Sequence, residues 1–176
     1  MRLMHLFSFG NRERRAVAKA LYDSLMATAL DPAPFEAGFA VDTFEGRFEH
    51  VSLLSAVLLR RLRREGAAGQ TLAEDVYKLV FSGFDYAYRE TGVGDSSISR
   101  KVRGLGETFF GFATNLDNAL NADEGAALAA FIQRNGLGGR APAALEAYLR
   151  DLDTNLTNQT GADLLRGKIN WPLVHK

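Results

Sequence analysis

The chain has 176 residues, 47% of them hydrophobic, so it is long enough to form one domain with a buried core. Its 21 basic and 21 acidic residues give a formal net charge of zero. This disfavours a nucleic-acid-binding protein, because such proteins usually carry a basic excess. The absence of Cys excludes disulfides and thiolate metal sites, and no apolar run approaches the roughly 20 residues that span a bilayer.

Residues 1–10 are apolar but few, and no small-residue cleavage site is evident, so we do not interpret them as a signal peptide. Three interpretations stay open for this segment: a frayed terminus, a segment docked on the core, or a segment that touches an anionic membrane surface. The third draws on the cations Arg12, Arg14 and Arg15 that follow it. We expect residues 11–176 to form a single helical domain.

Helical periodicity dominates the chain, and we predict an all-α protein, a single compact bundle of about six to seven helices. The first predicted helix covers residues 11–30 and ends at Pro32 and Pro34, which cannot donate backbone hydrogen bonds. The second follows Asp42 or Thr43 and carries one apolar stripe. It ends in the basic run of residues 60–64, which suits the negative end of a helix.

Two further helices are predicted from caps and stripes. Thr71 and Glu74 form a capping box that opens a helix to about Glu90, and the next helix starts between Asp95 and Ser99. Its core stripe is Ile98, Val102, Leu105, Phe109, Phe112, Leu116 and Leu120. Gly104, Gly106 and Gly111 interrupt this helix, which we attribute to a tight helix crossing, with a bound peptide as the alternative.

The last third of the chain continues the helical pattern. Residues 121–124 resemble an N-terminal cap for a helix that ends near Arg134. Pro142 is placed well for the first turn of the following helix. A short helix is predicted over residues 161–166.

The usual catalytic constellations are missing from the sequence. The three His are His5, His50 and His175, and none is spaced to share a metal with another. We interpret His50 as a surface or satisfied helix side chain. No Gly-X-Ser-X-Gly elbow, phosphate loop or dinucleotide fingerprint is present. We therefore expect a protein that is not an enzyme and that binds no cofactor or metal.

The stretch from Tyr88 to Arg103 is the most specific part of the chain. It predicts a helix end with Tyr88 and Arg89, a corner formed by Gly92, Gly94 and Asp95, and a new helix that begins with Arg100, Lys101 and Arg103. Cations near a helix N-terminus gain nothing from the helix dipole, so an acidic partner or a local carboxylate is needed to explain them. Phe110 falls off the core stripe and is the expected exposed contact. We predict that Tyr88, Arg89, Arg100, Lys101, Arg103 and Phe110 bind a client.

The chain resembles the ubiquinol–cytochrome c chaperone family from about Arg14 to Pro172. The resemblance rests on residues 44–49, 85–95, 101–103, 109–111 and 165–172. The corner within residues 89–95, followed by a basic helix, is fairly specific to this family. The sequence departs from the family pattern at Phe110, where a tyrosine is expected.

The resemblance implies a helical, non-enzymatic assembly factor that binds newly made cytochrome b during assembly of the cytochrome bc complex. A small helper protein, the ribosome and the membrane surface are further candidate partners. The lack of a long targeting extension indicates a bacterial member, cytoplasmic and at the inner face of the plasma membrane. A small-molecule-binding or catalytic helical domain and a ribosome- or nucleic-acid-binding module are the alternatives.

Overall fold

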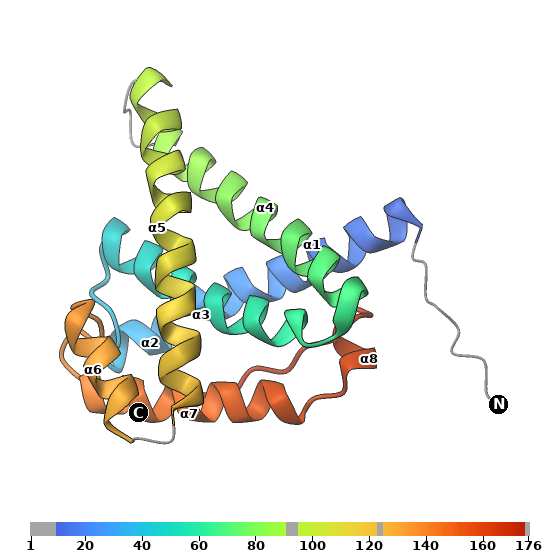
Figure 1. Cartoon of the computed structure of the whole chain (residues 1–176). Helices are drawn as coiled ribbons and strands as arrows, with labels where there is room; N and C mark the ends of the chain where they lie inside the picture. The colour runs from blue at the N-terminus through green and yellow to red at the C-terminus, as the bar shows by residue number, and fades with distance from the viewer. Residues whose placement is uncertain (1–9, 91–94, 123–124, 175–176) are drawn as a thin grey trace.

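The computed structural model describes residues 10–90, 95–122 and 125–174, with the backbone alone for residues 95–103. These residues form helices and no strand, which confirms the predicted all-α fold (Figure 1). The helices are α1 (Asn11–Ala29), α2 (Pro32–Glu36), α3 (Phe44–Arg63), α4 (Gly66–Glu90), α5 (Asp95–Asn121), α6 (Ala126–Arg134), α7 (Pro142–Asn158) and α8 (Gly161–Leu164). Both α2 and α8 are short, with five and four residues.

Helix α3 is the centre of the bundle and contacts α1, α4, α5 and α7. Every residue from Val51 to Leu62 is buried. The sequence there is apolar on several sides of the helix, which is the pattern of a helix surrounded by others. The single stripe expected from the sequence is thus only part of the buried surface, since Leu53, Val57 and Leu59 are buried as well. The helix start expected after Asp42 or Thr43 is confirmed, and Thr43 is its N-cap, because the Thr43 hydroxyl accepts a 3.2 Å hydrogen bond from the Gly46 amide.

Helices α4 and α5 meet at one end of the molecule and separate toward the other, where α5 reaches α6 (Figure 1). Both helices pack against α3. Midway along the two helices, aromatic rings fill the space between them, with Tyr77 and Phe81 of α4 facing Phe109 of α5.

Two predicted helix starts are wrong. Helix α4 begins at Gly66, five residues before Thr71, and the Thr71 hydroxyl donates to the Ala67 carbonyl at 3.0 Å. Thr71 is therefore an interior residue that bonds back along its own helix and not an N-cap. Helix α5 runs through Asn121, and α6 starts after Gly125, so residue 121 closes a helix where a cap was expected. Residues 123–124 of that expected cap lie outside the described part of the chain.

The tight crossing predicted from three glycines of α5 holds for one of them. A Cβ at Gly106 would lie 3.1 Å from the Tyr77 hydroxyl, so this glycine allows α4 to approach. A Cβ at Gly104 or Gly111 would meet nothing within 4 Å. These two glycines face open space, and the expectation of a helix crossing there is wrong.

Two arginines near the end of α3 point inward and hold other helices. The Arg60 guanidinium pairs with Asp117 of α5 and Asp153 of α7, and it also donates to the Asn121 amide oxygen at 2.5 Å. Arg61 donates to the carbonyls of Leu156 and Gln159 at 2.8 and 2.9 Å. Carbonyls at a helix end lack partners within the helix, so Arg61 satisfies the C-terminal end of α7.

The His50 imidazole is buried, and its Nδ1 donates to the carbonyl of Ala29 at 2.8 Å. Ala29 is the last residue of α1, so His50 binds one of the carbonyls left free at that helix end. The expectation of a surface side chain is wrong, and the alternative of a satisfied helix side chain holds for Nδ1 alone, because Nε2 is buried without a hydrogen-bond partner. Burial lowers the His50 pKa, and the hydrogen bond to Ala29 opposes this only in part.

Replacing Arg60 by Met should lower the free energy of unfolding by about 2 kcal/mol, because two carboxylates lose their counter-ion. The loss stays below that of a fully buried pair, since the Asp117 side chain is 44% exposed. Urea denaturation measures the change. Arg64→Met, at an exposed position next to the helix end, should alter it by less than about 0.5 kcal/mol. Equal losses in both variants would contradict the role assigned to Arg60.

The buried His50 makes stability depend on pH. Its pKa is lower in the folded than in the unfolded chain, so below about pH 6.5 the unfolded chain takes up a proton first. Stability should therefore fall by on the order of 1 kcal/mol between pH 7.5 and 5.5. His50→Gln should flatten that dependence in urea denaturation series at the two pH values. An unchanged slope in the variant would show that other groups cause it.

Candidate functional site

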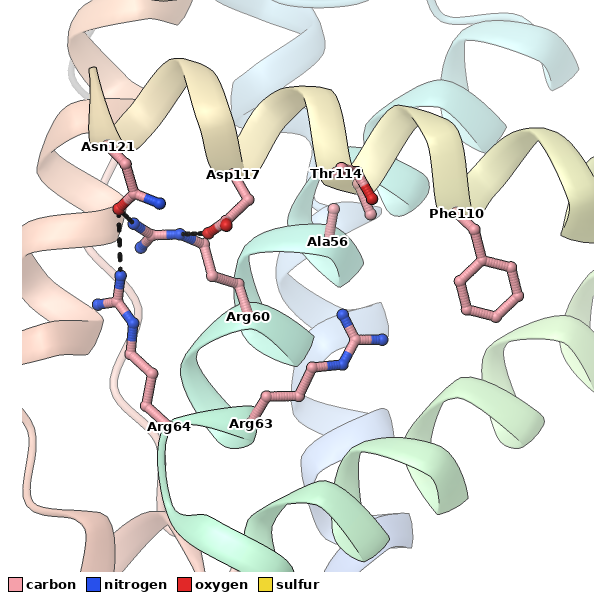
Figure 2. A pocket seen from close by; sticks show the side chains of 9 residues that line it. Ala56, Arg60, Arg63, Arg64, Phe110, Thr114, Asp117 and Asn121 are labelled. Carbon is pink, nitrogen blue, oxygen red and sulfur yellow. Dashed lines mark hydrogen bonds and ion pairs between the residues drawn. The ribbon is translucent and has the colours of Figure 1, made fainter.

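An open groove lies between α3 and α5, with a volume of about 340 Å³ (Figure 2). We call it the α3–α5 groove. Its lining combines small, aromatic and charged side chains: Ala56, Arg60, Arg63, Arg64, Phe110, Ala113, Thr114, Asp117 and Asn121. The lining residues come from the C-terminal half of α3 and the C-terminal half of α5. The groove is large enough for a few side chains of a ligand.

Phe110 forms the apolar part of the groove and is 52% exposed. Its ring centroid lies 5.2 Å from that of Tyr77, and the Tyr77 ring lies 4.4 Å from Phe81. The exposed ring is thus supported from the α4 side by an aromatic stack. Phe109 is buried, which confirms the expectation that Phe109 belongs to the core and Phe110 to the surface.

The charged part of the groove is formed by the end of α3. Asp117 and Asp153 neutralise Arg60, whereas Arg64 makes only a long contact of 3.5 Å with the Asn121 amide oxygen. Among the described residues Arg63 has no hydrogen-bond or ion-pair partner. The remaining positive charge at this end of the groove comes from Arg63 and Arg64.

The sequence predicts a simple basic helix end for residues 60–64 and does not separate the two buried arginines from the two exposed ones. Arg60 and Arg61 continue the buried run of α3, and Arg63 and Arg64 leave it. Arg60 lies four residues after Ala56 and three after Val57, so it shares their buried side of α3. Partners 57 and 93 residues away along the chain give no local pattern, so the sequence alone did not reveal them.

The predicted client-binding residues are not all near this groove. The Tyr88 ring packs edge-on against Phe44, with centroids 5.0 Å apart, and Arg89 Nε donates to Asp85 at 2.8 Å. Burial, followed by the charge of Glu45, raises the pKa of the Tyr88 hydroxyl. Tyr77 supports the Phe110 ring, and Tyr88 lies about 16 Å further along α4. Phe110 and Tyr88 therefore face opposite ends of α3.

The remaining predicted residues fall where less is described. The backbone of Arg100, Lys101 and Arg103 lies in the first turns of α5, and their side chains are outside the described part of the structure. Gly92 and Gly94 of the predicted corner also lie outside it. Asp95 is the first residue of α5, which confirms a helix start in the expected range. Its side chain is not described, so its role as a cap stays a prediction.

A second cavity of about 130 Å³ lies on another side of α5. It is mostly apolar and is lined by Phe48, Glu49, Ser52, Leu105, Thr108, Phe109, Phe112 and Leu137. Burial raises the pKa of the Glu49 carboxyl, and the charge of Glu45 adds to this effect.

No group of three or more metal-ligating side chains occurs among the described residues. Within the same residues no helix is long and apolar enough to cross a membrane.

The fold and the groove define an all-α protein with an open, cation-rimmed surface site. A sequence profile of the family described as ubiquinol-cytochrome C chaperone matches residues 40–171, and the chain belongs to this family. The crystal structure of the Cbp3 homolog from Brucella abortus is similar, with a TM-score of 0.81 and 28% sequence identity. The match covers 93% of this chain and 92% of that one. A search of curated proteins found no match.

Proposed function

We propose that the protein is a non-enzymatic chaperone that binds newly made cytochrome b during assembly of the cytochrome bc complex. Membership of the ubiquinol-cytochrome C chaperone family is the observation that carries this proposal. The similarity to a Cbp3 homolog over nearly the whole of both chains supports it. We further propose that the protein acts at the inner face of the plasma membrane.

The α3–α5 groove has the properties that a chaperone for a membrane protein needs. A client that is not yet assembled exposes apolar helices flanked by polar loops, and an open apolar surface with a charged rim accepts both. Phe110 supplies apolar area without further ordering cost, because Tyr77 already supports its ring. Arg100, Lys101 and Arg103 belong to the first turns of the same helix and are proposed as further charged contacts for the client.

Affinity purification of a tagged copy from native membranes tests the proposal. Cytochrome b should co-purify, and deletion of the gene should lower the amount of assembled cytochrome bc complex. A helper protein or ribosomal proteins in the same fraction would identify further partners. Purification without cytochrome b from membranes that are actively making the complex would disprove the proposed client.

Phe110→Asp should reduce the amount of co-purified cytochrome b about tenfold, because a charge replaces the apolar contact. Phe110→Ala should reduce it less. Half of the Phe110 residue is exposed, so neither change should lower the free energy of unfolding by more than about 1 kcal/mol. Leu173→Asp, at a residue 77% exposed in the C-terminal segment, is the matched control. Equal effects of Phe110→Asp and Leu173→Asp would exclude Phe110 from the client site.

Reversal of the three cations Arg100, Lys101 and Arg103 to Glu should weaken client binding about tenfold. Stability should change little, because these residues lie in the second and third turns of α5, where the helix dipole has little effect on a charge. The triple variant Arg12→Glu, Arg15→Glu and Arg134→Glu makes the same change in net charge elsewhere and should leave the yield unchanged. Quantitative co-purification in detergent, where lipid contact does not contribute, separates the two. Unchanged yield after reversal of residues 100, 101 and 103 would remove them from the site.

A further inference from the structure

The α3–α5 groove has an unbalanced charge at one end. Three arginines line it, but only Arg60 has carboxylate partners, Asp117 and Asp153. Arg63 has no partner among the described residues, and Arg64 has only a long contact to an amide oxygen. The two side chains that remain available for a ligand both belong to the end of α3.

The helix dipole does not account for the direction of the Arg63 side chain. It stabilises any cation in the last turn of α3 by about 0.3–1 kcal/mol and does not select where the side chain extends. Figure 2 shows the Arg63 side chain reaching into the space between α3 and α5, on the side where the Phe110 ring lies. An arginine placed next to apolar surface is suited to bind a carboxylate that arrives together with an apolar group.

The opposite end of the groove accepts a bulky apolar side chain. Ala56 and Ala113 are small residues that leave room, and the supported ring of Phe110 forms one wall. At about 340 Å³ the groove holds side chains but not a helix backbone, so a helical ligand lies across its open mouth. Residues three or four apart on such a helix present their side chains to the same surface.

The geometry points to a helical segment of the client that places one carboxylate against Arg63 and a bulky apolar side chain against Phe110, at a spacing of three or four residues. This rests on the proposed function and specifies the chemistry of its site. A phosphate group fits less well, because the donors of Arg60 are occupied and the exposed Asp117 carboxylate repels a second negative charge. The three lining arginines and the two aspartates paired with Arg60 leave one net positive charge, which a single carboxylate neutralises.

Overlapping peptides of the host's cytochrome b, with blocked ends, provide the probe. Fluorescence anisotropy should detect binding of peptides that contain Asp or Glu three or four residues from a Phe, Leu or Trp. Replacing that acid by Gln or Asn should weaken binding about tenfold. The Arg63→Glu variant should bind the acidic peptide about tenfold more weakly. It should bind more tightly the peptide in which Lys replaces the acid, because the exchanged charges restore the ion pair.

Arg134→Glu is the matched control, because Arg134 is also an exposed arginine at the last position of its helix. Both reversals place a negative charge at a helix C-terminus and carry the same dipole penalty. The inference is overturned if Arg63→Glu binds like Arg134→Glu, if acidic and amide peptides bind equally, or if no peptide binds. It is also overturned if vesicles of anionic lipid compete for the groove in an Arg63-dependent way. Cytochrome b that still co-purifies with Arg63→Glu would leave the proposed function standing while this inference fails.

Discussion

The arrangement of α3, α5 and α7 depends on the ion pairs that the Arg60 guanidinium forms with Asp117 and Asp153. Helix α3 is apolar around most of its surface, and hydrophobic contact alone does not define how a neighbour is oriented on such a helix. The ion pairs with Asp117 and Asp153 are directional and join α5 and α7 to one point of α3. The same point closes one side of the α3–α5 groove, so the site and the helix packing share this contact.

Much of the fold could be predicted from the sequence because its signals are local. The apolar stripe of α3, the cap at Thr43 and the proline at the start of α7 each depend on residues within one or two turns. The exposure of Phe110 followed from its position off a core stripe. The capping box at Thr71 failed because the same hydroxyl bonds equally well to a carbonyl inside a longer helix.

The candidate site could be predicted only in part, because its remaining features depend on contacts between distant helices. The two inward arginines and the two outward ones form one continuous basic run in the sequence. Only the packing of α5 and α7 distinguishes them, as Arg60 and Arg61 find partners there. Burial of His50 against the end of α1 is likewise a consequence of how two helices meet. These contacts join helices that lie far apart in the sequence, so no local pattern indicates them.

The open positions of Gly104 and Gly111 have a consequence for how α5 behaves. Alanine would fit at both without contact and would favour the helix by about 1 kcal/mol at each position. Helix α5 therefore has a lower intrinsic helix stability than it would have with alanine at these two positions, and packing against its neighbours stabilises it. In native-state hydrogen exchange such a helix opens at a lower free energy than the rest of the core. The wall of the α3–α5 groove that α5 forms should therefore open more easily than the wall that α3 forms.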